Sequence, residues 1–435
     1  MKNVFFVAVL FCVVFSSCTN SAKNDGWISL FNGKDLSGWK QLSGRNGNAK
    51  YEVIDSVIVG TTVANTPNSF LVTEKTYSDF ILELDLFMEE PMNSGIQFRS
   101  LSKEEYNEGR VHGYQCEVDP SARAWSGGIY DEARRGWLYP MTLNPEGGKP
   151  FKLNDWNHYR IECIGSTIRT WLNGVPAAYL IDNMTPEGFI ALQIHSVNEG
   201  KEGRHIKWKN IRIKTKNLKP LPVTKPVFVM NNVFGNLSEE EMKDGWQWLW
   251  NGKTTTGWNG IGSDQFPSER WEINNEILTV SELGNKQKTD LVSEEQYGAF
   301  ELQWRFMLSK GASGGIQYLA NIDEKQKNHI TGFEYQLQDD ENSSDTTAVK
   351  SLASLYGLIG SVQKGKSIKP VDGWNHARIV VRPDKHIEHW LNGAKVLEYN
   401  ANDGDFKGTA EKGHIVLKDE GKEVSFRDIK IKTLE

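Results

Sequence analysis

Strict alternation of apolar and hydrogen-bonding side chains marks the stretch Gly113-Tyr114-Gln115-Cys116-Glu117-Val118-Asp119. Side chains two residues apart share one face of an extended strand, so Tyr114, Cys116 and Val118 point one way and the polar residues point the other. The pattern predicts a half-buried strand whose polar face forms the floor of a cleft. A glycine-rich segment, residues 125–132, follows closely enough to fold over that floor.

The same alternation recurs in other parts of the chain, at residues 80–87, 158–164, 167–172 and 188–194. Leu172-Asn173-Gly174-Val175 adds a hairpin signal, because Asn-Gly supplies the positive φ angles of a type I′ turn. The 40 glycines point to many turns. Many short strands without a convincing long helix predict an all-β fold, built as a two-sheet sandwich.

An internal duplication divides the chain into two domains. The paired landmarks, which recur in the same order, are residues 26–34 and 245–253, 93–98 and 313–318, 156–158 and 374–376, and 171–174 and 390–393. We therefore predict a first domain at residues 26–216 and a second domain at residues 244–435. Residues 217–243 form the linker, and its proline-rich beginning is typical of an extended spacer. Ser238 ahead of three glutamates predicts one helical turn near the linker's end.

The N-terminus resembles a bacterial lipoprotein signal peptide, residues 1–18, in which Lys2 and an apolar run precede Cys18. Cys18 would then carry the lipid after cleavage, and residues 19–25 would form a polar tether. The apolar run is too short to span a bilayer, which needs about 20 residues. We therefore expect a cell-envelope protein that is held by lipid alone, facing the periplasm or on the outer-membrane surface. An ordinary secretory peptide with an incidental cysteine is the alternative.

Composition limits the kinds of molecule that this protein is expected to bind. The net charge of −6 gives no electrostatic reason to expect nucleic acid. The 15 Trp, 13 Tyr and 19 Phe suit the flat faces of sugars, although many rings in a β-rich protein are simply core. Cys116 and Cys163 lie on the apolar sides of alternating stretches. They either pair in a disulfide or remain buried free thiols.

The polar faces of three expected strands supply candidate site residues. These residues are Gln97 and Arg99 on one strand, Gln115, Glu117 and Asp119 on the next, and Gln193 and His195 on the third. If the strands share one sheet, the floor carries a histidine, two carboxylates, an arginine and three amides. The alternative is a solvated sheet face, although such faces favour Lys, Thr and Glu.

Aromatic and charged residues gather within the glycine-rich segment and just after it. They are Trp125, Tyr130, Asp131, Arg134, Arg135 and Trp137. Guanidinium groups beside aromatic rings suit a polyol or an oxyanion, so these six are candidate substrate-binding residues. A surface turn with an aromatic anchor explains the same residues equally well.

The second repeat keeps the apolar pattern but changes the polar floor. The matched pairs are Gln97 and Gln317, Arg99 and Leu319, Gln115 and Glu334, Glu117 and Gln336, and His195 and Glu420. The arginine and the histidine are lost, and acid and amide exchange places. We therefore expect the chemistry in the first domain and a degenerate second copy.

Familiar catalytic signatures do not fit this sequence. Sandwich-fold glucanases carry a second acid soon after the first pair, but Ser121 and Ala122 stand where it would fall. A Gly-x-Ser-x-Gly elbow and a dinucleotide fingerprint are missing as well. We expect no cofactor, although a divalent cation on Glu117, Asp119 and His195 stays an alternative.

The landmark segments resemble the 3-keto-disaccharide hydrolase family. The matching segments are residues 30–39, 93–97, 113–119 and 171–174, and the resemblance extends over both repeats. It implies a concanavalin A-like jelly-roll sandwich in each domain. It also implies a carbohydrate substrate, namely a glycoside whose sugar a separate dehydrogenase has already oxidised at C3.

A ketone at C3 acidifies the hydrogen on C2, so a base can remove that proton and the C1 group can leave by elimination. Such a reaction needs a general base and donors for the enolate, but no carboxylate nucleophile. His195 is the candidate base, since a histidine ordinarily changes charge near neutral pH. Glu117 is the alternative base or the acid for the leaving group, with Asp119 assisting. The candidate enolate and hydroxyl binders are Gln97, Arg99 and Tyr130.

Two other functions stay open at this point. One is a sugar-binding lipoprotein without catalysis, because sandwich folds also serve as lectins. The other is a conventional glycosidase whose carboxylates come from different strands. Activity on an unoxidised glycoside would distinguish the conventional glycosidase.

Overall fold

The computed structural model describes residues 25–435, apart from 224, 283, 285, 324, 326–328, 346, 363–365, 367 and 404–409. The predicted signal peptide and Cys18 lie outside these residues. The described α-helices are two short ones, α1 (Pro145–Gly148) and α2 (Glu239–Lys243), and single 3-10 turns occur at Asn107–Gly109, Met141–Leu143 and Ala348–Lys350. In the described part of the chain, no helix combines the length and the apolar character that a membrane span requires.

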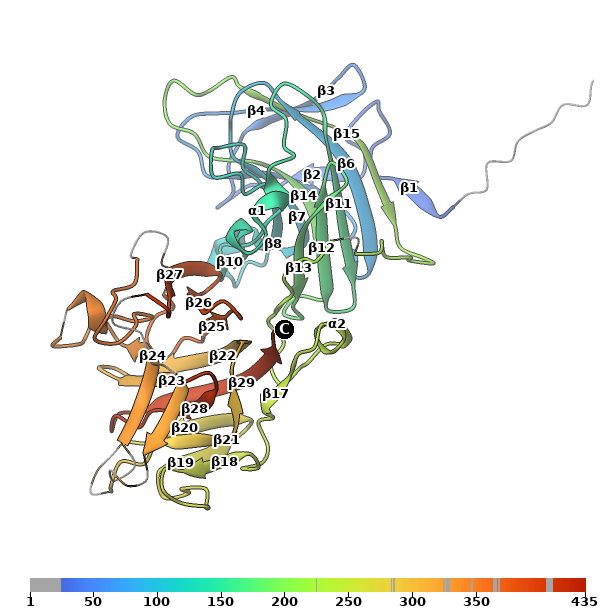
Figure 1. Ribbon diagram of the computed structural model, residues 1–435. Coiled ribbons are helices and arrows are strands. Elements are labelled where there is room, and N and C mark those ends of the chain that lie inside the picture. The colour runs from blue at the N-terminus through green and yellow to red at the C-terminus, as the bar shows by residue number, and fades with distance from the viewer. Residues whose placement is uncertain are drawn as a thin grey trace, which may run out of the picture.

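Two sheets form the first domain (Figure 1). The larger sheet runs β16 (Met230–Asn231), β13 (Val175–Ile181), β12 (Thr167–Leu172), β11 (Asn157–Ile164), β6 (Phe80–Met88), β15 (His205–Lys214), β4 (Val57–Thr61) and β3 (Lys50–Ile54), with β1 (Trp27–Ser29) paired to β15. The smaller sheet runs β10 (Gly136–Tyr139), β9 (Ile129–Glu132), β8 (His112–Val118), β7 (Ser94–Leu101), β14 (Phe189–Ile194), β5 (Ser69–Thr73) and β2 (Trp39–Gln41). This smaller sheet carries the predicted floor.

The second domain repeats the arrangement. Its larger sheet runs β19 (Trp271–Asn274), β20 (Ile277–Val280), β29 (Val424–Thr433), β22 (Phe300–Leu308), β25 (Asn375–Val381), β26 (His386–Leu391) and β27 (Ala394–Asn400), with β17 (Gln247–Trp250) paired to β29. Its smaller sheet runs β18 (Trp258–Gly260), β21 (Leu291–Tyr297), β28 (Gly413–Leu417), β23 (Ser313–Asp323) and β24 (His329–Gln338). The predicted all-β fold with two jelly-roll sandwich domains is confirmed.

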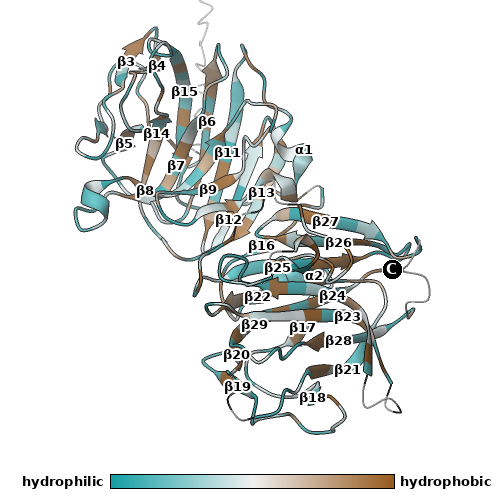
Figure 2. Ribbon diagram, turned by 90° about the vertical axis from the view of Figure 1, so that its left-hand side faces the viewer, coloured by the Kyte–Doolittle hydropathy of each residue, from teal (hydrophilic) through white to brown (hydrophobic). Residues whose placement is uncertain are grey.

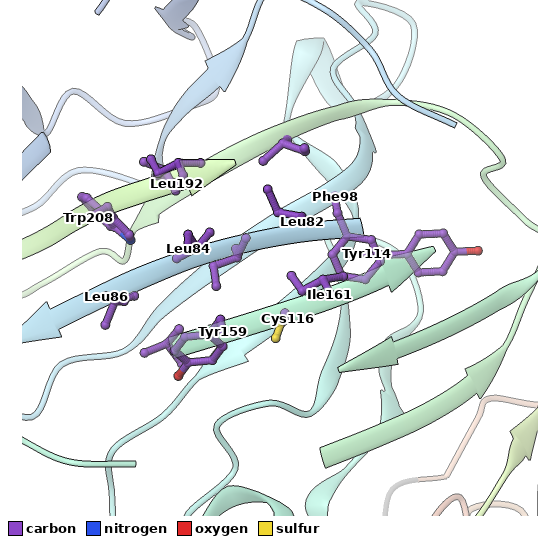
Figure 3. Packing of buried hydrophobic residues seen from close by; sticks show 14 of the residues in the cluster. Leu82, Leu84, Leu86, Phe98, Tyr114, Cys116, Tyr159, Ile161, Leu192 and Trp208 are labelled. Atoms are coloured by element: carbon purple, nitrogen blue, oxygen red, sulfur yellow. The ribbon is translucent and has the colours of Figure 1, made fainter. Parts of the chain in front are cut away.

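Apolar side chains from the inner faces of the two sheets meet in the core of each domain. In the first domain β6 contributes Leu82, Leu84 and Leu86, which are spaced two residues apart and fully buried. Figure 3 shows these leucines in one cluster with Tyr114 and Cys116 of the smaller sheet. Along the strands in Figure 2, hydrophobic and hydrophilic segments alternate. Burial of each such leucine contributes about 2 kcal/mol, so the period-two pattern is what holds the sheets together.

The two cysteines of the first domain are buried in this core. Cys116 and Cys163 are free thiols rather than a disulfide. Burial raises the pKa of Cys163 to about 12, so this thiol stays protonated. Of the two alternatives left open by the sequence, the structure has the two buried free thiols.

The linker takes part in both domains instead of separating them. Its strand β16 adds in parallel to β13 of the first domain. The predicted helical turn is α2, and Ser238 caps it by accepting a hydrogen bond from the Glu241 backbone nitrogen at 3.1 Å. Glu241 in turn forms an ion pair with Lys430 of the second domain, 2.9 Å apart. These contacts hold the two domains in a defined relation.

Candidate active site

Part of the polar face that the sequence predicts assembles on the smaller sheet of the first domain. Strands β14, β7 and β8 are neighbours, so Gln193, Gly95 and Glu117 lie in one row across the sheet. Gln97 and Gln115 form the next row. Three amides and one carboxyl group therefore share one face, and all four are almost completely buried.

A chain of amide hydrogen bonds leads to Glu117. Gln97 and Gln193 both donate to Gln115 Oε1, at 2.5 and 2.8 Å, and Gln115 Nε2 donates to Glu117 Oε2 at 2.9 Å. Gly95 makes this arrangement fit, because a Cβ atom there would lie 2.2 Å from Gln115 Cδ. The chain points its donors at the carboxyl group and holds it in one orientation.

Glu117 is the carboxyl group best suited to proton transfer. Its side chain is 4% exposed, and Asn93 Nδ2 donates to its Oε1 at 2.5 Å. Burial raises the pKa of Glu117 to about 7, although the donors Asn93 and Gln115 oppose the shift. A carboxyl group with this pKa is present in both protonation states near neutral pH, as a general acid or base must be.

Asp119 has the opposite character. Burial tends to raise its pKa, but hydrogen bonds from Ser121 and Arg123 outweigh burial and lower the pKa. Arg123 Nη2 lies 2.6 Å from Asp119 Oδ2, and the same guanidinium lies over the Trp125 ring at 4.1 Å. Asp119 therefore stays ionised and positions Arg123, whereas Glu117 can exchange a proton.

His195 lies just after β14, at a pocket of about 230 Å³ that Asn93 also lines. Its Nδ1 is 2.9 Å from the Ser196 carbonyl oxygen. A neutral imidazole that donates from Nδ1 presents its lone pair at Nε2. Asn93 lines this pocket and also donates to Glu117 on the floor.

Three aromatic rings stand beside the floor. Tyr130 pairs with Gln115 across β9 and β8. Trp137 meets Trp125 and Tyr130 edge to face, with ring centroids 4.5 and 5.2 Å apart. Burial raises the pKa of Tyr130, so its hydroxyl remains a hydrogen-bond donor. The rings offer an apolar surface of the kind that packs against sugar faces.

Arg99 does not lie on this face, and the expectation that it would share a face with Gln97 is wrong. The pairing of β7 with β8 shifts register between Phe98 and Leu101, and Arg99 has a φ angle of 44°. This bulge turns the side chain away from the floor. Its guanidinium donates to the Ser78 and Gly165 carbonyl oxygens, at 2.7 and 2.8 Å. The sequence pattern cannot reveal a bulge, because the alternation continues through it.

Asp131, Arg134 and Arg135 also lie away from the floor. Asp131 alternates with Tyr130 on β9, is fully buried, and accepts from Arg134 Nε at 2.8 Å and from Arg135 Nε at 2.5 Å. Arg135 Nη1 further donates to Asp182 Oδ2 at 2.8 Å. These ion pairs tie the β9–β10 hairpin to the end of β13. The two arginines face a pocket between the domains instead of the floor.

Two residues beside the floor were missed by reasoning from the sequence. Asn93 belongs to a sequence segment that recurs in the second repeat. Its role depends on the pairing of β7 with β8, which brings it to Glu117. Arg123 carries no pattern signal, and only the loop after β8 brings it to Asp119. Gln193 Oε1 is a further feature, since it is buried and makes no hydrogen bond to any described residue.

A cation held by Glu117, Asp119 and His195 does not fit the geometry. Their ligand atoms do not form a group within 4.8 Å of one another. Among the described residues, the group that does is His386, Glu388 and Glu398 on the second domain. Lys395 and Arg382 lie within 3.8 Å of these carboxylates, so ion pairing already compensates their charge.

Comparisons with known proteins follow the internal repeat. The model of the family described as 3-keto-alpha-glucoside-1,2-lyase-like domain matches residues 26–214 and again residues 245–432. A protein of Bacteroides thetaiotaomicron named 3-keto-disaccharide hydrolase is 30% identical over 234 residues, which span 44% of this chain and 79% of the relative.

Two solved structures resemble parts of the chain. A putative glycosyl hydrolase from Parabacteroides distasonis is 26% identical, covers 47% of this chain and 100% of its own, and has a TM-score of 0.42. A carbohydrate binding module from Bacillus subtilis is 18% identical, covers 41% of this chain and 95% of its own, and has a TM-score of 0.27.

Proposed function

The chain belongs to the family of 3-keto-alpha-glucoside-1,2-lyase-like domains, and we propose that its first domain cleaves the glycosidic bond of 3-keto-glycosides. The tandem arrangement expected from the landmarks is confirmed, since both repeats match. The name of the bacterial relative supports a glycosidic-bond-cleaving enzyme. The observation that carries the finer proposal is the position of Glu117, a buried carboxyl group with a pKa of about 7 that accepts a hydrogen bond from Asn93, which also lines the His195 pocket.

The reaction begins with loss of the C2 proton, which the neighbouring C3 ketone acidifies. The base takes this proton, and the electron pair of the C2–H bond forms a C2–C3 enolate with its negative charge on the C3 oxygen. When the C3 carbonyl forms again, the electron pair moves into a C1–C2 double bond and the C1–O bond breaks. The departing oxygen takes a proton from an acid. Addition of water across the double bond, in this site or in a partner enzyme, then completes hydrolysis.

We assign His195 as the base and Glu117 as the acid. The His195 ring lies at the pocket that Asn93 lines, and the same Asn93 donates a hydrogen bond to Glu117. The hydroxyl of Tyr130 and the guanidinium of Arg123 are the donors for the enolate oxygen. Trp125 and Trp137 would pack against the sugar ring.

Supply of the substrate and the location of the protein are part of the proposal. A 3-keto-glycoside arises by oxidation of a sugar hydroxyl, so a separate dehydrogenase must precede this enzyme. Cys18 would carry the lipid that holds the mature chain in the cell envelope. Labelling with a fatty-acid probe should mark the natural chain and leave a Cys18→Ala variant unmarked.

The direct test compares a 3-keto-glucoside with the same glucoside unoxidised, each with and without a chelator. We expect release of the leaving group from the oxidised compound alone, whether or not the chelator is present. Release from the unoxidised compound would instead identify a conventional glycosidase. Tight binding of both compounds without turnover would identify a sugar-binding protein and overturn the proposal.

A further inference from the structure

A second hollow lies where the two domains meet. Figure 1 shows β10 of the first domain beside β25–β27 of the second. The pocket there has a volume of about 740 Å³ and is bounded by the β9–β10 hairpin, the linker and loops of the second domain. Pockets of this size hold small ligands, and this one is separate from the Glu117 floor.

Contacts across the junction fix the walls of this pocket. Lys369 Nζ of the second domain donates to the Arg135 carbonyl oxygen at 2.7 Å. Thr142 Oγ1 of the first domain donates to the Gly393 carbonyl oxygen at 2.5 Å. Arg305 Nη2 reaches the Asn231 carbonyl oxygen of the linker at 2.6 Å. The pocket is therefore formed in advance of any ligand, which lowers the entropic cost of binding.

The lining of the pocket is electropositive. Its cationic side chains are Arg134, Arg135, Arg305 and Lys369, and its one carboxylate is Asp182. Behind the lining, buried Asp131 compensates part of the hairpin's charge.

The second-domain wall keeps an excess of positive charge. Asp428 is shared between two guanidinium groups, those of Arg305 at 3.4 Å and Arg427 at 3.6 Å. Lys369 uses one of its three N–H donors in a hydrogen bond to a carbonyl oxygen, and it forms no ion pair with a described carboxylate. Burial, reinforced by Arg135, lowers the pKa of Lys369, as expected of a cation crowded by others. An anion would relieve this crowding.

Aromatic rings accompany the charges. Trp374 and Phe234 line the pocket with ring centroids 6.3 Å apart. Arg427 lies over both rings, 3.7 Å from the Phe234 centroid and 5.3 Å from the Trp374 centroid, and so holds them in place. Trp137 of the first domain also lines the pocket. Flat rings next to cations are the combination that recognises a sugar bearing an acidic group.

We propose that the interdomain pocket binds an acidic saccharide, with the sugar ring on Trp374 and its carboxylate or sulfate at Lys369 and the guanidinium groups. The site is independent of the reaction proposed for the first domain. It also explains the Arg134-Arg135 run, which the floor does not use. The second domain would then serve the enzyme by completing a binding site rather than by catalysis.

Calorimetry on the full chain carrying Glu117→Gln tests this binding without turnover. The probes are methyl glucuronide for a carboxylate, glucose 6-sulfate for a sulfate, and methyl glucoside as the neutral counterpart. We expect at least one acidic probe to bind about tenfold more tightly than methyl glucoside, and Lys369→Met to remove that preference. Lys369→Arg should retain it, and Lys310→Met, an exposed lysine outside the pocket, should leave it unchanged.

Three results would overturn the proposal. The first is equal affinity for acidic and neutral probes. The second is equal loss with Lys369→Met and Lys369→Arg, which would indicate a contact between the domains and not charge recognition. The third is unchanged binding in Trp374→Ala, checked for folding by its thermal midpoint.

Discussion

The smaller sheets of the two domains share one strand order, from β2 to β8 in the first and from β18 to β24 in the second, and differ in their polar faces. In the first domain Glu117 accepts a hydrogen bond from Asn93 at 2.5 Å. In the second domain Gln336 occupies the same place and donates to Ser313 Oγ at 3.2 Å. The second domain therefore keeps a hydrogen bond between the corresponding two positions. The Gln336 amide, however, cannot act as a general acid or base. The difference teaches that duplication preserved the packing of this face and not its chemistry.

A buried carboxyl group is nevertheless present on both faces. Glu334 stands where the first domain has Gln115, and burial raises its pKa to about 7, the value that Glu117 also has. Its neighbours differ, because Lys418 stands in place of Gln193 and pairs with Asp290 at 2.5 Å. A raised pKa therefore reflects burial on this sheet face, and the surrounding groups decide whether it serves catalysis.

The largest expected effect is a difference in turnover between substitutions of the two buried carboxyl groups, Glu117 and Glu334. Glu117→Gln should lower turnover of a 3-keto-glucoside about a thousandfold, because general acid catalysis is removed from the proposed site. Glu334→Gln is the matched control and should change turnover by less than about twofold. Turnover of both variants is measured by release of the leaving group. A large loss in Glu334→Gln with little loss in Glu117→Gln would place the site in the second domain.

The histidine is the next way to sharpen the comparison, since the second domain has Glu420 in its place. His195→Ala should lower turnover about a hundredfold through loss of the base. His205→Ala, an exposed histidine at the start of β15, serves as the control and should retain full turnover. Full activity of both variants would mean that another group removes the C2 proton.

The shared burial of the two carboxyl groups should appear in the pH dependence of stability. The pKa of Glu117 is about 7 in the folded chain, against an ordinary value of 4.5. The folded state thus keeps the proton longer, so this stabilisation is complete below about pH 4.5 and is lost as the pH rises through 7. The loss amounts to about 3 kcal/mol.

Thermal unfolding between about pH 5 and pH 8 measures this loss. Glu117→Gln should flatten the decline in the thermal midpoint of the first domain. Glu334→Gln should do the same for the second domain, although it leaves turnover unchanged. A decline of the same steepness in Glu117→Gln would show that its carboxyl group is not the source.

The smallest effect concerns the bulge that both domains share. Leu319 occupies the position of Arg99 with a similar φ angle, 49° against 44°, and is buried in the core. Arg99→Leu should therefore fold and lose about 1–3 kcal/mol, because carbonyl oxygens at Ser78 and Gly165 lose their donors. Turnover of the folded fraction should be unchanged. A large loss of turnover at unchanged stability would restore Arg99 to the site.

Much of the floor was predictable from the sequence. Gln115 and Glu117 share a face because side chains two residues apart on a strand always do, and Gln97 and Gln193 follow by the same rule. The neighbours of Glu117 were harder to predict. Asn93 lies just before β7, and its contact with Glu117 depends on the register between two strands.

Two kinds of residue escaped prediction for a physical reason. Arg99 follows the same alternation as its neighbours, and only the register shift between β7 and β8 shows that it turns away. The sequence pattern of Arg134 and Arg135 predicts substrate binding, but both arginines form ion pairs with buried carboxylates, Asp131 on β9 and Asp182 just after β13. Asp131 is close to both arginines in the sequence, but its burial is not visible there, and Asp182 is 47 residues from Arg135.

The sequence by itself determined the duplication, the all-β fold and the set of polar residues on each strand, because alternation and turn signals are local properties of the chain. Only the tertiary structure decided which strands are neighbours, and hence that Glu117 accepts a hydrogen bond from Asn93, which also lines the His195 pocket. It alone decided the pKa of about 7, since burial depends on everything packed around the carboxyl group. The pocket between the domains likewise exists only because the linker joins both sheets and brings their charges together.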